Sequence, residues 1–177
     1  MLFRFLAGAA LIASPAAAQG LDARATGERD LFEKVVEIPT VEMRGQMRRL
    51  VQLLSAEFRK AGITAITVKD DEGRPGVKTQ TMVVRWPAKN PSKKPIVLMA
   101  HMDVVDAKPS DWKHDPFTFR EEGGYYLGRG TNDNKAGVVG IVAALARLKA
   151  SGFVPSRHII VLFTGDDGTG GKGGGPR

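Results

Sequence analysis

Residues 95–103 read PIVLMAHMD, a short apolar run that changes abruptly into a histidine and an aspartate. Further along the chain, residues 128–137 read GRGTNDNKAG and lead into a long apolar helical pattern. A buried strand that ends in polar residues, with a carboxylate at the start of a helix, is how α/β proteins assemble a site. We therefore expect His101, Asp103 and Asp133 to lie together at one edge of a sheet, where they would form half of a metal centre.

The composition limits the kinds of site that the chain can build. Its 177 residues are enough for one domain with a hydrophobic core, and 42% hydrophobic with 25% charged residues is typical of globular proteins. The sequence contains no cysteine, which excludes disulfides, thiolate zinc ligands and a cysteine nucleophile. Any metal site must therefore use imidazole and carboxylate ligands.

The first residues of the chain have the pattern of an export signal. Residues 1–20 read MLFRFLAGAALIASPAAAQG, with one arginine near the start, then an apolar run, then small residues before Gln19. This pattern predicts a secretory signal peptide over residues 1–18. The run is short for a transmembrane helix and contains Pro15, and an uncleaved membrane anchor is the alternative. We expect a secreted or periplasmic protein with no stable membrane anchor after signal cleavage.

The formal net charge of the chain is +7. Much of the positive charge falls on one predicted helix, at Arg44, Arg48, Arg49, Arg59 and Lys60. Basic patches can bind nucleic acid or anionic membranes. In this helix the basic residues share the surface with an apolar stripe, and no aromatic residues for base stacking are interleaved. We interpret the charges as a solvated helix face and expect no nucleic-acid partner. The alternative, a basic module for an anionic surface, predicts strongly salt-dependent binding.

The hydrophobic pattern predicts helices over residues 30–38, 42–61 and 134–149, and strands over residues 63–69, 80–86, 96–100, 125–127 and 158–164. The strands at 96–100 and 158–164 show no alternation of apolar and polar residues, which indicates burial on both faces, as in the centre of an α/β sheet. The class that we expect is α/β, with three layers and a mixed central sheet. Residues 165–177 are mostly glycine, so we expect a disordered tail there.

The paired motifs resemble those of the M20 family of zinc metallopeptidases. The resemblance rests on HMD at residues 101–103, GRGTNDNKAG at residues 128–137 and, between them, WKHDPF at residues 112–117. The family comprises dizinc exopeptidases and aminoacylases related to glutamate carboxypeptidase, acetylornithine deacetylase and succinyl-diaminopimelate desuccinylase. The resemblance implies that residues 19–164 are the N-terminal part of a zinc-exopeptidase-like catalytic domain. It also implies a zinc cofactor and a peptide or N-acyl amino acid substrate.

The resemblance assigns roles to three residues of these motifs. By it, His101 is a ligand of one zinc ion and Asp103 orients the ring of that histidine. Asp133 would bridge the two zinc ions that members of the family hold. The exopeptidase chemistry of the family then depends on two consecutive glutamates after the next strand. The first of these is the general base and the second is a zinc ligand.

The sequence departs from the family pattern at those two glutamates. Residues 165–169 read GDDGT, so Asp167 takes the position of the base and the ligand position falls on Gly168, which has no side chain. A register shifted by one residue would instead make Asp166 the base and Asp167 the ligand. Aspartate is one methylene shorter than glutamate, and a shift of about 1 Å in a catalytic group can cost on the order of a hundredfold in rate.

The resemblance implies a second zinc site that is incomplete. The family's later acidic ligand, its final histidine and its second domain have no counterpart in the sequence. We therefore expect a fold that is incomplete at the C-terminus, and a truncated family member with weak or no activity. The alternative is a non-catalytic remnant that binds metal only partially.

Overall fold

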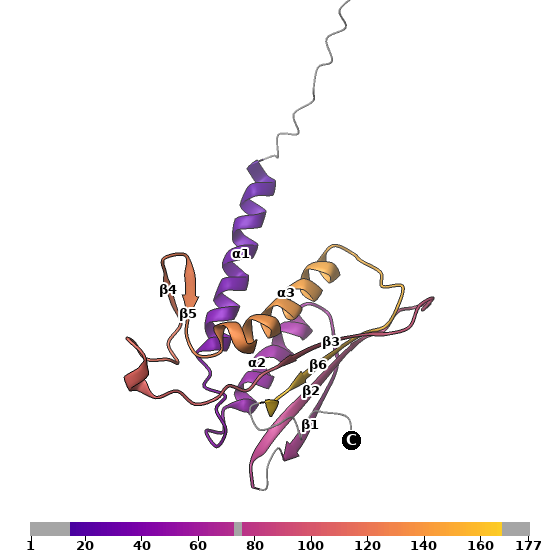
Figure 1. Ribbon diagram of the computed structural model, residues 1–177. Coiled ribbons are helices and arrows are strands. Elements are labelled where there is room, and N and C mark those ends of the chain that lie inside the picture. The colour runs from indigo at the N-terminus through magenta and orange to yellow at the C-terminus, as the bar shows by residue number, and fades with distance from the viewer. Residues whose placement is uncertain (1–14, 73–75, 168–177) are drawn as a thin grey trace, which may run out of the picture.

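The computed structural model describes residues 15–72 and 76–167 (Figure 1). The helices of this part are α1 (Pro15–Val36), α2 (Met47–Lys60) and α3 (Ala136–Ala150), and a short 3₁₀ turn occupies Pro109–Asp111. The strands are β1 (Ala65–Glu72), β2 (Lys78–Trp86), β3 (Ile96–His101), β4 (Arg120–Glu122), β5 (Tyr125–Leu127) and β6 (Ile159–Thr164). The expected signal peptide lies outside the described residues, except for residues 15–18, whose backbone belongs to α1.

Four strands form one mixed sheet in the order β1-β2-β6-β3. Strand β2 is antiparallel to both β1 and β6, whereas β3 runs parallel to β6, with His101 opposite Thr164 at the end of the register. Because β3 and β6 are parallel, their carboxyl ends meet at the same edge of the sheet. The segments that follow these strands, 102–106 and 165–167, therefore leave the sheet side by side. The α/β class and the mixed sheet that the sequence predicted are confirmed.

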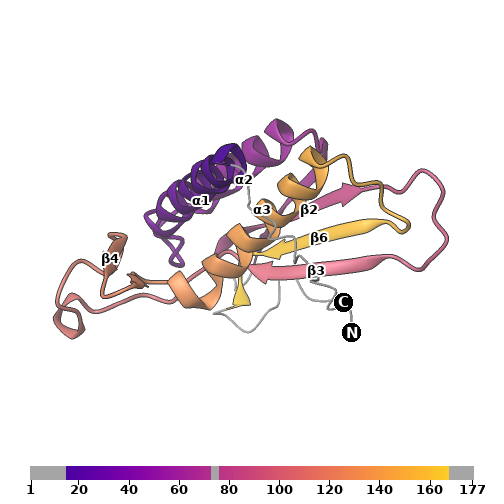
Figure 2. The same ribbon diagram turned by 90° about the horizontal axis from the view of Figure 1, so that it is seen from above.

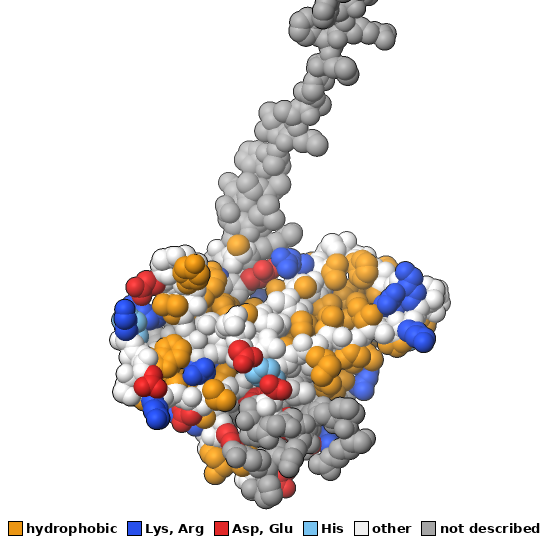
Figure 3. Space-filling view, in the orientation of Figure 1, with side chains coloured by type: hydrophobic (Ala, Val, Ile, Leu, Met, Phe, Trp, Pro, Cys, Tyr) orange, Lys and Arg blue, Asp and Glu red, His pale blue; other side chains and the backbone are white. Residues whose placement is uncertain are grey.

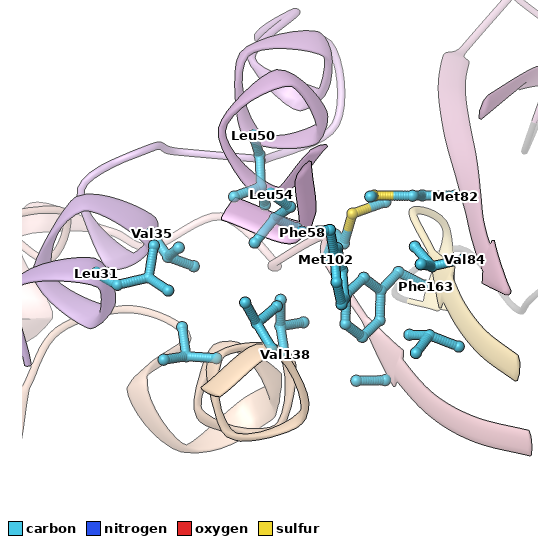
Figure 4. Packing of buried hydrophobic residues seen from close by; sticks show 14 of the residues in the cluster. Leu31, Val35, Leu50, Leu54, Phe58, Met82, Val84, Met102, Val138 and Phe163 are labelled. Carbon is cyan, nitrogen blue, oxygen red and sulfur yellow. The ribbon is translucent and has the colours of Figure 1, made fainter. Parts of the chain in front are cut away.

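Helices α1, α2 and α3 lie on the same side of the four-stranded sheet (Figure 2). Each contributes an apolar face, because its hydrophobic residues recur at the spacing of a helical turn. Figure 4 shows Leu54 and Phe58 of α2, Val138 of α3 and Phe163 of β6 directed toward one another, and all four side chains are almost fully buried. Within residues 15–72 and 76–167, no helix covers the opposite face of the sheet, where a three-layer arrangement would place its other helices.

The strand predicted over residues 96–100 is present as β3, but it lies at the edge of the sheet, so the prediction that it is buried on both faces was wrong. Ala100 faces the helices and is buried, but Val97 and Met99 on the other face are 52% and 60% exposed. Figure 3 shows hydrophobic side chains gathered over the part of the molecule where α3 and β3 lie in Figure 1. The continuous apolar run reflects two apolar faces, of which the described residues bury only one.

Some element boundaries also differ from the predicted ones. Helix α2 begins at Met47 rather than at residue 42, because Met43 (φ 68°) and Gly45 (φ 67°) have left-handed backbone that no helix accommodates. Strand β4 was not predicted, since all three of its residues are polar and exposed. In the part of the chain that the structure describes, no helix is both long enough and apolar enough to span a bilayer.

Candidate metal centre

His101 ends strand β3 and contacts an aspartate from a distant part of the chain. Its ring atom Nε2 lies 2.8 Å from Oδ1 of Asp133, and Nδ1 lies 3.1 Å from the carbonyl oxygen of Asp103. The imidazole is mostly buried, with 14% of its side chain exposed, whereas the Asp133 side chain is 83% exposed. The structure therefore brings His101 and Asp133 together, as the sequence predicted.

Asp103 contacts His101 through its backbone carbonyl and Asp167 through its side-chain carboxylate. Its backbone carbonyl, at 3.1 Å, is closer to Nδ1 of His101 than its carboxylate Oδ1, which is 3.5 Å away. The carboxylate instead accepts a hydrogen bond of 3.1 Å from the backbone N–H of Asp167. The main chain of Asp103 thus fixes the histidine ring, and its buried side chain fixes the loop that follows β6.

Of the two consecutive aspartates after β6, Asp167 is the one that faces the histidine. Its Oδ2 lies 3.7 Å from Nε2 of His101, and its side chain is 65% exposed. Asp166, in contrast, is almost fully buried, with 2% of its surface exposed. This arrangement favours the unshifted register, in which Asp167 rather than Asp166 takes the position of the general base.

The loop that carries these aspartates is packed rather than disordered. Gly165 is buried, and its carbonyl accepts a hydrogen bond of 2.5 Å from Oγ1 of Thr79 on β2. A Cβ atom at Gly165 would lie 2.7 Å from the carbonyl oxygen of Gln80, so only glycine fits this close approach. Residues 165–167 of the predicted tail thus pack against β2, and residues 168–177 lie outside the described part, so the disordered tail stays a prediction.

Asp133 projects from an irregular turn, Thr131–Lys135, and not from the first turn of α3, which begins at Ala136. The backbone of Asp133 is extended (φ −125°, ψ 97°), and its peptide bond to Asn134 is cis. Gly130 precedes the turn with φ 89°, a left-handed conformation that favours glycine. The glycines of GRGTNDNKAG therefore permit the backbone path that directs Asp133 toward His101.

The electrostatic environment of His101 favours positive charge. Burial lowers the pKa of the imidazole, but the hydrogen bond to Asp133 and the nearby charges of Asp103 and Asp167 together raise that pKa above its ordinary value. The carboxylates of Asp103, Asp133 and Asp167 therefore all lie near the imidazole of His101. Figure 3 shows acidic side chains gathered around a histidine near the middle of the face in view.

The donor atoms of this cluster suit zinc, which binds imidazole nitrogen and carboxylate oxygen at about 2.0–2.2 Å. Two ligands of a tetrahedral zinc ion are then about 3.3 Å apart. Nε2 of His101 and Oδ1 of Asp133 lie 2.8 Å apart, somewhat closer than that value. The Asp133 side chain is exposed, so a small rotation about its side-chain bonds would bring the two donor atoms to the spacing of zinc ligands. Within the described residues, no group of three or more ligand side chains is already arranged as a metal site.

An open pocket of about 1060 Å³ adjoins this centre. Asp103 and Asp166 line its polar side, while Met43, Met47 and Val105 contribute apolar surface. The volume lies just above the range of about 300–1,000 Å³ that is typical of pockets for small molecules.

Lys135, which ends the turn that carries Asp133, is a buried residue that sequence reasoning missed. Its side chain is fully buried, and burial lowers its pKa to about 7. The available signal was a lysine placed directly before an apolar helix, inside the motif that carries Asp133. A single sequence does not reveal that its hydrogen-bond partners are the carbonyl oxygens of Val36 and Ile38.

Comparison with known proteins agrees with this arrangement. Residues 97–177 match the family described as peptidase family M20/M25/M40. Aminoacylase-1 from Sus scrofa is 32% identical over 145 residues, which are 81% of this chain and 34% of that protein. A probable carboxypeptidase S-like 2 from Dictyostelium discoideum is 36% identical over 99 residues, 55% of this chain and 19% of that protein.

The fold also matches solved structures. The dipeptidase Dug1p from Saccharomyces cerevisiae superimposes with a TM-score of 0.73 at 23% identity, covering 87% of this chain and 35% of that one. Human carnosine dipeptidase 1 gives a TM-score of 0.72 at 19% identity, with the same coverage. The chain thus spans about a third of the length of the aminoacylases and dipeptidases that it resembles. The match to peptidase family M20/M25/M40 over residues 97–177 includes both paired motifs, and the relatives are consistent with it.

Proposed function

We propose that this chain is part of a zinc-dependent hydrolase that cleaves a peptide or N-acyl amide bond next to a terminal residue. The observation that carries the proposal is the 2.8 Å contact between Nε2 of His101 and Oδ1 of Asp133. It joins two motifs of the M20 family at the carboxyl edge of the sheet, where α/β proteins bind ligands.

The side chains of the centre take separate roles in this proposal. His101 and Asp133 would hold zinc, and Asp103 would keep the His101 ring in place through its carbonyl oxygen. Zinc, when bound, would supply a Lewis acid that polarises the carbonyl oxygen of the substrate. Asp167 would accept a proton on its carboxylate from the attacking water and return it to the leaving nitrogen. The exposure of Asp167 leaves it free to reach both atoms.

The proposed substrates are peptides or N-acyl amino acids, as the names of the relatives suggest. The chain is similar to an aminoacylase and to a probable carboxypeptidase, and its fold is that of two dipeptidases. The pocket beside Asp103 offers apolar surface from Met43, Met47 and Val105. We propose that this surface receives an apolar side chain or acyl group of the substrate.

We further propose that one zinc ion is held firmly and a second one weakly, with slow turnover. The M20 ligand position that follows Asp167 is occupied by Gly168, which offers no donor atom. The second candidate function is partial metal binding without catalysis, and the lack of a ready-made group of three ligands among the described residues favours it. Residues 1–18 support export, so we propose a secreted or periplasmic location.

Zinc-dependent hydrolysis by the purified full chain tests the proposal. The release of free amino acid from a panel of N-acetyl amino acids and dipeptides would be measured with added zinc and after chelation. Hydrolysis should require zinc and should vanish in His101→Ala. His114→Ala is the matched control, because His114 is an exposed histidine outside the centre. Hydrolysis that survives His101→Ala would refute the proposal, and zinc binding without any turnover would favour the second candidate function.

A further inference from the structure

The side chain of Lys135 is fully buried, which is unusual for a lysine. Its Nζ donates hydrogen bonds to the carbonyl oxygens of Ile38 (2.6 Å) and Val36 (3.2 Å). Val36 ends α1, and the last carbonyls of a helix lack partners within the helix and carry partial negative charge. Ile38 follows two residues after the helix, and its carbonyl also accepts a hydrogen bond from the backbone N–H of Thr40. The amino group of Lys135 thus satisfies the carbonyls of Val36 and Ile38, and the cost of its desolvation appears as the lowered pKa of about 7.

Lys135 also closes the turn that carries Asp133, through both its backbone and its side chain. The backbone N–H of Lys135 donates to the carbonyl oxygen of Gly130 over 3.0 Å. A Cβ atom at Gly130 would lie 3.1 Å from Cδ of Lys135, so the lysine stem packs directly against that glycine. The turn is therefore held at its base by the same residue that reaches α1.

The segment after α1 also holds the other half of the centre. Oγ1 of Thr40 donates to the carbonyl oxygen of Met102 over 2.6 Å, and the backbone N–H of Val104 donates to the carbonyl oxygen of Thr40 over 3.2 Å. These bonds fix the chain on both sides of Asp103, directly after His101. Residues 36–41, which we call the anchor segment, therefore bind both the end of β3 and the turn that carries Asp133.

We propose that Lys135 is a positioning residue of the metal centre. By tying the Asp133 turn to the anchor segment, it sets the separation between the donor atoms of His101 and Asp133. The inference rests on the proposed function, because it assigns the support of the same metal centre. It does not depend on the charge of the lysine, since the ammonium and the neutral amine each have the two N–H donors that the two carbonyls require.

The test compares Lys135→Met, which keeps the stem and removes the donors, with Leu54→Ala as a matched control. Leu54 is a fully buried residue of α2, outside the segments that carry His101 and Asp133, so we expect its truncation to destabilise the fold without loosening the Asp133 turn. Zinc affinity would be measured by competition with a chromophoric chelator. Lys135→Met should lose about 10–100-fold in zinc affinity, the usual effect of removing a supporting group. Leu54→Ala should stay within about twofold of the wild type while folded.

A second readout needs no metal. The side-chain nitrogen resonances of the three histidines report the hydrogen bonding of each ring. In Lys135→Met the His101 signals should move toward those of the exposed His114, because the bond to Asp133 loosens. The inference is overturned if His101 signals and zinc affinity equal those of the wild type, or if Leu54→Ala changes both as much.

Thr40→Val provides a second variant in case Lys135→Met does not fold. It removes the Oγ1 donor to Met102 at nearly constant volume, so it loosens the anchor segment at its other contact. The inference predicts a several-fold loss of zinc affinity and altered His101 signals in this variant as well, and unchanged values would contradict it. If the wild type binds no zinc, the proposed function fails, and the histidine signals of the metal-free protein still decide the role of Lys135.

Discussion

Replacing Gly130 with alanine is a quantitative test of how tightly the Asp133 turn is packed. The backbone at Gly130 has φ 89°, where a residue with a side chain loses about 1–2 kcal/mol. The new Cβ would lie 2.6 Å from Cγ1 of Val104 and 3.1 Å from Cδ of Lys135, closer than ordinary contact. Such overpacking costs about 1–3 kcal/mol. We expect Gly130→Ala to lower the free energy of unfolding by about 2–5 kcal/mol, a large fraction of the stability of a small domain.

Gly124→Ala is the matched control for this variant. Gly124 has a similar backbone (φ 80°), but an added Cβ would meet no atom within 4 Å. Its replacement should therefore cost only the backbone term of about 1–2 kcal/mol. Urea unfolding followed by circular dichroism would give both values, and their difference isolates the overlap with Val104 and Lys135. Equal losses in the two variants would refute the view that the turn is closely packed.

Three further outcomes follow from the packing and charges of the described residues. Because burial lowers the pKa of Lys135 to about 7 from 10.5, the unfolded chain binds its proton more strongly, so the free energy of unfolding should rise from pH 7 toward pH 10.5. Urea unfolding at pH 7 and pH 9.5 should show a smaller rise in Lys135→Met than in the wild type. An equal rise in the two proteins would contradict the lowered pKa of Lys135. Phe163→Ala should lose about 3–5 kcal/mol in urea unfolding, and a loss below about 1 kcal/mol would exclude its place in the core. Replacing Val97 and Met99 with serine should change stability by less than about 0.5 kcal/mol and reduce light scattering at high concentration. A loss as large as that of Phe163→Ala would show that their face of the sheet is buried.

The convergence of His101 and Asp133 could be predicted because it depends on local rules. An apolar strand that ends in HMD places polar residues at the carboxyl edge of a sheet, and a glycine-rich turn before an apolar helix returns the chain to that edge. The role of the Asp103 carboxylate could not be predicted in the same way. Its partner is the backbone N–H of Asp167, and that bond depends on how the loop after β6 packs against Thr79.

The place of β3 in the sheet could not be predicted from its residues. An apolar run such as 96–100 shows that both faces can be buried, but it does not show which neighbours are present. The burial of Lys135 could not be predicted from the sequence for a related reason. Its acceptor at Ile38 lies 97 residues earlier in the chain, so the sequence shows only a charged residue at a helix start. Contacts between distant segments decide both features.

The zinc content of the full chain, with and without the Asp133 carboxylate, tests the central claim most directly. Equilibrium dialysis followed by metal analysis would compare the wild type with Asp133→Ala and with Asp115→Ala, an exposed aspartate outside the centre. Joint coordination by His101 and Asp133 predicts about one retained zinc ion per chain in the wild type and in Asp115→Ala, and loss of that ion in Asp133→Ala. Zinc retained equally by all three proteins, or by none of them, would contradict the account.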